Sequence, residues 1–186
     1  MTNISLRLET AADYAEVENL TREAFWDVYH PGCSEHLLAH KLRGCAAFVP
    51  QLDFVAELDG RVAGNIMYTR ARVAGADGVD REVLIFGPVS VLPQYQKRGI
   101  GSALIRHTLK LAGEMGFAGV IIFGKPAYYK RFGFADAKEF GITTPEGENF
   151  PVFMALPLRP GALAGYAGKF YADPVYQMDE AEVAAF

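Results

Sequence analysis

The pattern of apolar and polar positions predicts a short strand and two amphipathic helices at the start of the chain. Residues 4–8 place their apolar side chains on one face of a strand, as at the margin of a sheet. Residues 13–29 then repeat apolar positions at helical spacing, with Thr10 expected as the cap and Pro31-Gly32 as the stop. A second helix is expected within residues 34–44.

A hairpin and a long apolar strand are predicted next. Residues 54–58 and 61–73 read as strands around Asp59-Gly60, a pair that tolerates the positive φ values of a tight turn. Residues 82–92 form a long apolar run that Gly87-Pro88 interrupts. Because proline cannot donate to a ladder, the interruption indicates a bulge or a place where the neighbouring strand parts.

Residues 98–116 predict the longest helix, and residues 120–123 form a short apolar strand after it. This order of strand, helix and strand indicates a βαβ unit with parallel strands, the second buried on both faces. The fold class expected is therefore α/β, with helices flanking a central mixed sheet. Later elements are expected at 126–132 (helix), 134, 150–156 and 168–171 (strands), and 179–186 (one or two helical turns).

Length and composition are those of one globular domain. The chain has 186 residues, of which 51% are hydrophobic and 22% charged. The sequence contains no internal repeat, low-complexity stretch or linker that would call for a second domain. We therefore expect a single domain over residues 1–186, with a core at about 4–156 and a C-terminal extension at about 157–186.

Charge and cysteine content remove several classes of protein. The net charge of −4 argues against a nucleic-acid partner, although a local basic patch exists at Lys97-Arg98. No apolar run approaches the roughly 20 residues of a membrane span, and residues 1–9 lack the layout of a signal peptide. Cys33 and Cys45 have no metal-ligand spacing and are expected to be reduced, packing thiols. We therefore expect a cytoplasmic protein with no membrane partner and no metal.

The end of the long apolar strand carries the most specific chemistry. Residues 89–92 run into a basic turn, and Gly99 and Gly101 there let the backbone approach a ligand. The free N–H groups of the helix start and the charges of Lys97-Arg98 both attract an anion such as pyrophosphate. A P-loop is excluded because Gly101 is followed by Ser102-Ala103 and not by lysine, and a dinucleotide fingerprint lacks its third glycine. A glycine-rich connection without a ligand is the structural alternative.

Two motifs together resemble the GNAT superfamily of acyl-CoA-dependent N-acyltransferases. The first is Gln96-x-x-Gly99-x-Gly101 after a broken strand, and the second is a tyrosine, Tyr129, four residues before a Gly-Phe pair. The order of elements agrees over roughly residues 4–156. The sequence around the tyrosine is similar to a bacterial subgroup of acetyltransferases of unassigned substrate, but residues 123–127 lack the asparagine that many members carry.

The resemblance implies a GNAT-like fold, a twisted mixed sheet in which a parallel strand pair splays apart around acetyl-CoA. Tyr129 would be the general acid that protonates the departing CoA thiolate, with Tyr128 as the alternative. The backbone of the broken strand would pair with the pantetheine arm, an N–H near Val91 would face the thioester carbonyl, and the turn would bind the pyrophosphate. The implied cofactor-binding residues are Val89, Ser90, Val91, Gln96, Lys97, Arg98, Gly99, Ile100, Gly101 and Ser102.

The expected function is direct transfer of an acetyl group from acetyl-CoA to the amine of a small molecule or a peptide. The alternatives are a non-catalytic acyl-CoA-binding regulatory module and, less favoured, a dinucleotide-binding protein. No motif identifies the base that deprotonates the amine; Glu35, His36, His30 and Glu57 are the candidates. The resemblance also suggests a homodimer formed through the C-terminal strands.

Overall fold

The computed structural model describes residues 4–186, so residues 1–3 of the predicted domain lie outside the described part. The chain divides into two compact units. The first comprises the residues up to Tyr68 together with Gly87–Thr108 and Pro174–Phe186, and the second comprises Thr69–Phe86 and Leu109–Asp173. Two long strands and one long helix pass from one unit to the other. No helix within residues 4–186 combines the length and apolar character needed to cross a membrane.

The first unit contains a sheet in which the strand order is β1-β2-β3-β4. β1 is antiparallel to β2, and β2 is antiparallel to β3. Asp59 and Gly60 join β2 to β3 with φ values of 51° and 79°, which confirms the predicted tight hairpin turn. The elements that lie wholly or partly in this unit are β1 (Ile4–Leu8), α1 (Tyr14–Phe25), α2 (Glu35–Leu42), β2 (Phe54–Leu58), β3 (Arg61–Gly75), β4 (Asp80–Val91), α3 (Ile100–Glu114) and α5 (Glu180–Ala185).

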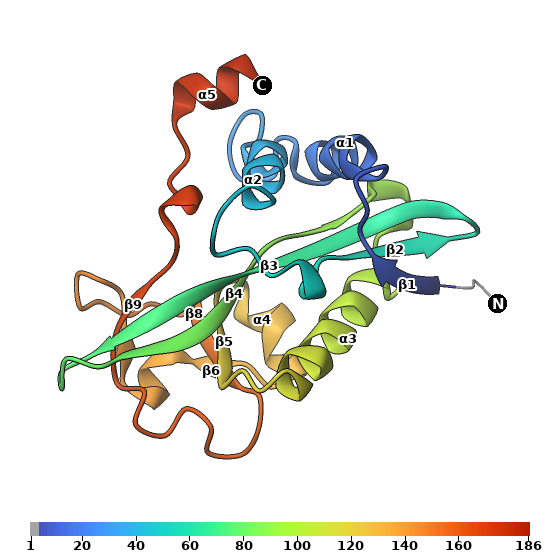
Figure 1. Ribbon diagram of the computed structural model, residues 1–186. Coiled ribbons are helices and arrows are strands. Elements are labelled where there is room, and N and C mark those ends of the chain that lie inside the picture. The colour runs from blue at the N-terminus through green and yellow to red at the C-terminus, as the bar shows by residue number, and fades with distance from the viewer. Residues whose placement is uncertain (1–3) are drawn as a thin grey trace. The chain divides into compact units, whose positions relative to one another are not determined.

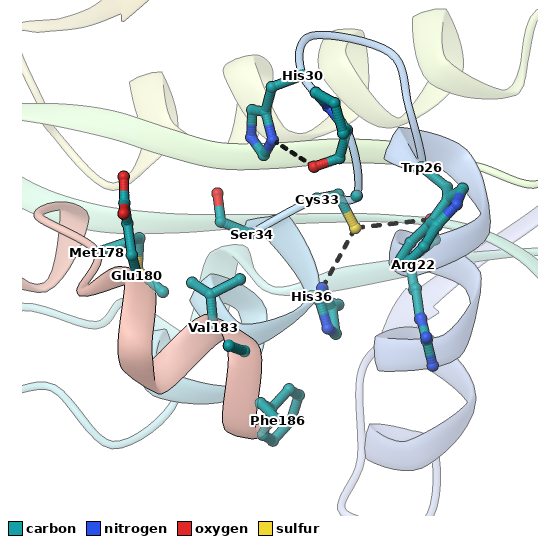
Figure 2. Close-up of a pocket in the computed structure, with 13 residues that line it drawn as sticks. Arg22, Trp26, His30, Cys33, Ser34, His36, Met178, Glu180, Val183 and Phe186 are labelled. Atoms are coloured by element: carbon teal, nitrogen blue, oxygen red, sulfur yellow. Dashed lines mark hydrogen bonds between the residues drawn. The ribbon is translucent and has the colours of Figure 1, made fainter.

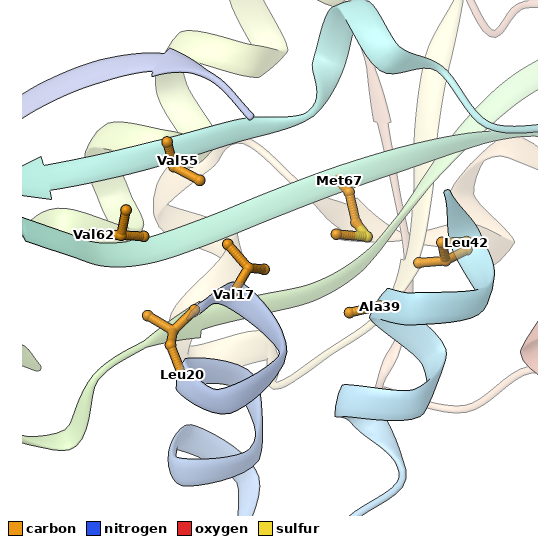
Figure 3. Close-up of a cluster of buried hydrophobic side chains, with 7 residues drawn as sticks. All are labelled: Val17, Leu20, Ala39, Leu42, Val55, Val62 and Met67. Carbon is orange, nitrogen blue, oxygen red and sulfur yellow. The ribbon is translucent and has the colours of Figure 1, made fainter. Parts of the chain in front are cut away.

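The core of the first unit lies between the sheet and helices α1 and α2. These helices cover one face of β2 and β3, and α3 begins on the opposite face (Figure 1). Apolar side chains at helical spacing meet side chains from the strands, and their burial supplies the main stabilisation of this layer. Figure 3 shows the cluster, which consists of Val17, Leu20, Ala39, Leu42, Val55, Val62 and Met67.

Helix α1 is shorter than predicted at both ends. The backbone N–H and the hydroxyl of Thr10 donate to the Asp13 carboxylate, both at 2.8 Å, so Thr10 closes a turn before the helix and does not cap it. Asp13 also accepts two hydrogen bonds from Arg7, which lower the pKa of its carboxyl. At the other end the helix stops at Phe25, and Asp27 adopts a φ of 57° while its carboxylate accepts from Gly32 N–H. The expected extension to Tyr29 was therefore wrong.

A buried cluster of charged groups ties β1 and β2 to the helices of this unit. Arg43 donates to both oxygens of Glu9, at 2.8 and 3.0 Å, and to Glu18 at 2.6 Å. Asp53 is only 5% exposed and accepts a hydrogen bond from Asn65 at 3.1 Å. Burial, followed by a hydrogen bond with Glu9, raises the pKa of Asp53 to about 9. Asp53 is therefore protonated at neutral pH.

The second unit contains two parallel strand pairs, β4 with β5 and β7 with β9. β3 and β4 are neighbours, and the order continues β4-β5-β8-β6, while β9 pairs with β3 and with β7. Among residues 4–186, Leu84–Val120 is the one Cα pair that joins β4 to β5 in parallel, whereas β8 pairs with all five residues of β5. The parallel pairing thus stops three residues before Gly87. The elements here are β5 (Gly119–Phe123), α4 (Pro126–Tyr129), β6 (Ala135–Asp136), β7 (Ile142–Thr143), β8 (Phe153–Pro157) and β9 (Gly168–Tyr171).

Several predicted boundaries in the later part of the chain differ from the structure. Residues 150–152 lie outside strand β8, which begins only at Phe153, and Phe134 precedes the two-residue strand β6. Strand β7 was not predicted. These strands are too short to produce an alternating pattern, so their sequence carries little signal. The mixed sheet with a parallel β4–β5 pair is confirmed, and β7 and β9 form a second parallel pair that was not predicted.

Candidate functional site

The turn between β4 and α3 exposes the backbone of a helix start. The Gln96 side-chain amide donates to the carbonyl oxygen of Val91 at 3.1 Å, which closes the turn. Lys97 and Gly99 have φ values of 60° and 87°, and α3 begins at Ile100, two residues later than predicted. Ala103 N–H donates to the Gly99 carbonyl at 2.9 Å, so the amides just before Ala103 belong to the first helical turn and have no acceptor within the helix. Such a turn can bind an anion.

The side chains of the predicted cofactor residues divide into a buried and an exposed group. Ser90 is fully buried, and its hydroxyl lies 2.9 Å from that of Thr21 on α1, while Ile100 is 1% exposed. Only the backbone of these two residues is therefore suited to contact a ligand. The other predicted residues are at least partly exposed: Val89, Val91, Gln96, Lys97, Arg98, Gly99, Gly101 and Ser102.

Gly64 on β3 lets the start of α3 lie close to the sheet. A Cβ at this position would come within 2.8 Å of the Ser90 carbonyl oxygen and 3.0 Å of Ile100 Cγ2. The first of these is a backbone atom and cannot rotate away. The glycine is therefore required by the close approach of β3, β4 and α3 in this unit.

We expect Gly64→Ala to lower the free energy of unfolding by about 1–3 kcal/mol, because the added methyl overpacks this contact. Urea unfolding measures the change. Gly113→Ala, on α3, is the matched control, since its Cβ would meet the Leu158 carbonyl oxygen only at 3.5 Å. The control should gain about 0.5–1 kcal/mol from the better helix former. Equal stability of wild type and Gly64→Ala would contradict the close approach.

Tyr129, in the second unit, lies within a group of aromatic rings at the end of α4. Its ring centroid is 5.9 Å from that of Phe86 and 5.8 Å from that of Phe134. Gly124 allows this position, because a Cβ there would overlap the Tyr129 ring. The adjacent Tyr128 lies under the guanidinium of Arg131, 4.3 Å from the ring centroid. The neighbouring rings thus fix the orientation of Tyr129. Tyr128 packs against Tyr129 and shares Phe132 with it, but differs in its contact with Arg131.

A pocket of about 620 Å³, which we call the C-terminal pocket, lies in the first unit. The α1–α2 connection and the ends of both helices form one side, and the C-terminal segment with α5 forms the other (Figure 2). The volume is typical of sites for small molecules. Sequence reasoning did not predict that the C-terminal segment forms part of this pocket. Its lining residues are Arg22, Trp26, His30, Pro31, Gly32, Cys33, Ser34, His36, Met178, Glu180, Val183, Ala184 and Phe186.

Cys33 and His36 form an uncharged pair in the wall of the pocket. The Cys33 Sγ lies 3.3 Å from His36 Nδ1 and 3.8 Å from the Arg22 carbonyl oxygen. Burial raises the pKa of the Cys33 thiol and lowers the pKa of the His36 imidazole. The sulfur is therefore a thiol at neutral pH and not an activated thiolate. The expectation of a reduced, packing cysteine fits this environment.

The four residues considered as bases lie in different places. His30 and His36 line the C-terminal pocket. Glu57 accepts a hydrogen bond from Arg7 at 2.7 Å on the β1–β2 pair, and Glu35 accepts one from Ser34 N–H at 3.0 Å. The two histidines thus line the pocket, and each of the two glutamates accepts a hydrogen bond from another residue. Within residues 4–186, no group of three or more His, Cys, Asp or Glu residues is arranged to hold a metal ion.

Comparison with known proteins assigns the fold. Residues 50–136 match the family model of the acetyltransferase (GNAT) domain. An uncharacterized N-acetyltransferase of Escherichia coli K12, YjhQ, is 36% identical over 124 residues, which cover 63% of this chain and 67% of that protein.

Two solved structures are similar over nearly the whole chain. The E. coli GNAT family N-acetyltransferase YhbS, in complex with CoA, gives a TM-score of 0.84 at 26% identity and covers 96% of this chain and 94% of that one. A GNAT family acetyltransferase from Brucella melitensis, in complex with acetyl-CoA, gives 0.74 at 29% identity, with 94% and 98% covered. These matches confirm the GNAT-type α/β fold. The chain belongs to the GNAT family of N-acetyltransferases.

Proposed function

We propose that the protein transfers an acetyl group from acetyl-CoA to the amine of a small molecule or a peptide. The observation that carries the proposal is the turn between β4 and α3, where the positive φ values of Lys97 and Gly99 turn a helix start and two cations toward solvent. Pyrophosphate is the anion that such a turn suits. The CoA and acetyl-CoA bound by the E. coli and Brucella relatives support the same ligand for this chain.

Separate groups of residues bind the cofactor and catalyse the transfer in this proposal. The backbone of Val89, Ser90 and Val91 pairs with the pantetheine arm, and the amides from Lys97 to Ser102 bind the pyrophosphate. Gln96 acts indirectly, because its amide closes the turn on the Val91 carbonyl. Tyr129 is the general acid. These roles rest on the motifs and on the local geometry of each unit.

The reaction is a direct transfer. The free amine attacks the thioester carbon, a C–N bond forms, the C–S bond breaks, and CoA leaves as a thiolate that takes a proton from Tyr129. An ammonium acceptor loses two protons in all, one of which restores the Tyr129 hydroxyl while the other goes to solvent. The Cys33 thiol supports direct transfer, because its raised pKa makes it a poor nucleophile for an acetyl-enzyme intermediate.

Acetyl-CoA is expected to stabilise the protein, because a ligand that binds only the folded state shifts the unfolding equilibrium. At about 100 times Kd the gain is about 2.7 kcal/mol, which corresponds to a rise in Tm of about 5–10 °C for a chain of this size. Differential scanning fluorimetry with acetyl-CoA, CoA and NAD⁺ measures it. A Tm that rises with NAD⁺ but not with acetyl-CoA would contradict the proposal.

Thiol release from acetyl-CoA in the presence of an amine panel then separates the enzyme from a regulatory module. Release that depends on an amine supports the transferase. A rise in Tm with acetyl-CoA but no release with any amine would favour the non-catalytic acyl-CoA-binding module. A single domain over 1–186, a cytoplasmic location and a homodimer stay predictions, and gel filtration with light scattering tests the last of them.

A further inference from the structure

Two pockets of the first unit share Arg22 and Trp26. One is the C-terminal pocket. The other, which we call the strand-end pocket, has a volume of about 630 Å³ and is lined by Asn19, Arg22, Glu23, Trp26 and Pro93. Arg22 and Trp26 therefore lie at the boundary between the two pockets, where one ligand group can contact them from either side.

The strand-end pocket adjoins the strand proposed to hold the acyl arm. Pro93 lies two residues after Val91, the last residue of β4. Thr21 fixes α1 to the same strand through the 2.9 Å contact between its hydroxyl and that of Ser90. The next residue, Arg22, lines both pockets. A reacting amine is therefore expected at the Pro93 end, close to the thioester.

Arg22 supplies a positive charge at this end. Its guanidinium carbon lies 4.8 Å from the centroid of the Trp26 ring, and no carboxylate within residues 4–186 is placed to form an ion pair with it. A guanidinium stacked on an aromatic ring keeps its N–H edge for a planar anion, and a carboxylate can accept two of these donors. The cation also disfavours the ammonium form of a nearby amine.

The far end of the C-terminal pocket is mainly apolar. Met178, Val183, Ala184 and Phe186 line it from the C-terminal segment, together with the carboxylate residue Glu180, and Phe186 is 49% exposed. The Cys33–His36 pair in the opposite wall is uncharged, as described above. Figure 2 shows Val183 on α5 and Phe186 directly after the helix, on this side of the pocket. An apolar or aromatic group gains free energy by entering here.

Contacts with α2 hold this apolar wall in place. Lys41 donates to the Glu182 carboxylate at 2.6 Å. The Phe186 ring lies 5.4 Å from the His36 ring and 5.0 Å from the His40 ring, measured between centroids. The C-terminal segment is therefore a formed part of the pocket.

We propose that the acceptor is an α-amino acid with a bulky apolar or aromatic side chain. Its carboxylate binds Arg22, its α-amine faces the Pro93 end, and its side chain enters the C-terminal pocket. The short distance between amine and carboxylate in an α-amino acid places both at the Arg22 end. The inference rests on the proposed acetyl transfer and adds the class of acceptor, with an N-acetylamino acid and CoA as products.

The test compares acceptors that differ only in the carboxylate. With acetyl-CoA saturating, kcat/KM is measured by thiol release for L-phenylalanine, L-phenylalaninamide and phenethylamine. We expect L-phenylalanine to exceed the other two by about tenfold or more, the usual worth of a charged hydrogen bond. In Arg22→Gln this ratio should fall to about one. Arg61→Gln, an exposed arginine elsewhere in the unit, is the control and should keep the wild-type ratio.

A second comparison tests the apolar wall. Phe186→Ala should raise KM for L-phenylalanine several-fold and leave KM for L-alanine unchanged, because only the larger side chain reaches the wall. A ratio near one in the wild type, or a carboxylate preference that survives Arg22→Gln, would overturn the inference.

Failure of the inference is separable from failure of the proposed function. If acetyl-CoA does not raise Tm, the proposed function fails first. If it does, and amines without a carboxylate are acetylated equally well, transfer stands and the amino-acid acceptor is wrong. Calorimetric titration of L-phenylalanine into the CoA complex gives a readout besides turnover, and absence of heat at millimolar ligand counts against the inference.

Discussion

Replacing Tyr129 by phenylalanine is expected to lower kcat by about 10²–10⁴, the usual contribution of a positioned general acid. Loss of the hydroxyl removes the proton that the CoA thiolate takes. Acetyl-CoA affinity should change little, because a phenylalanine ring can keep the contacts with Phe86 and Phe134. Steady-state thiol release gives kcat, and the ligand-induced rise in Tm gives the binding.

Tyr128→Phe is the matched control for this prediction. It removes the corresponding hydroxyl from the adjacent ring, which packs against Tyr129 and lies under Arg131. We expect kcat within about twofold of wild type. A large loss in Tyr128→Phe with normal turnover in Tyr129→Phe would transfer the acid role to Tyr128, and normal turnover in both would exclude these two tyrosines as the acid.

Asp53→Asn is expected to stabilise the protein increasingly as pH rises. The folded state holds the Asp53 proton up to a pKa of about 9, whereas the unfolded chain releases it near the ordinary value of 3.8. Between these values the folded state binds more protons, so the contribution of Asp53 is complete below about pH 3.8 and is lost as pH rises to about 9. Asparagine stays neutral, can accept from Asn65 and can donate to Glu9, and therefore avoids this loss.

Urea unfolding at pH 5, 7 and 8.5 measures the effect as the difference between variant and wild type. One proton difference changes stability by at most about 1.4 kcal/mol per pH unit. Asp77→Asn is the control, because the pKa of Asp77 is shifted in the opposite direction from that of Asp53. Hydrogen bonds from Arg81 lower this pKa to about 2. The contribution of Asp77 to stability is lost only as pH falls toward 2. The difference in free energy of unfolding between Asp77→Asn and wild type should therefore be constant from pH 5 to 8.5. Parallel stability curves for Asp53→Asn and wild type would show that Asp53 does not hold its proton.

Local sequence patterns predicted the elements whose signals lie within a few residues. The Asp59-Gly60 turn was predicted because both positions need positive φ, and the structure has 51° and 79° there. The turn before α3 was predicted from Gly99 in the same way. The longest helix was predicted well because its apolar spacing persists over four turns, although Lys97 at a φ of 60° delays its start.

The features that the sequence did not predict depend on contacts between distant residues. The end of α1 is set by Asp27, whose carboxylate accepts from Gly32 N–H, and this contact has no periodic signal. The proton on Asp53 depends on Glu9, 44 positions earlier in the printed sequence, and on burial that only the fold creates. The C-terminal pocket joins residues near position 30 to residues near position 180. Patterns within a single sequence do not show which distant residues come into contact in the fold.

The attachment of α5 bears on how the protein can change over evolution. This short helix is held to α2 by the Lys41–Glu182 pair and by the Phe186 ring, and it contributes no strand to the sheet. Substitutions or length changes in the last residues can therefore reshape one wall of the pocket while the turn before α3 keeps its geometry. Descendants of one ancestral gene could in this way acquire new acceptors and retain the same acetyl donor.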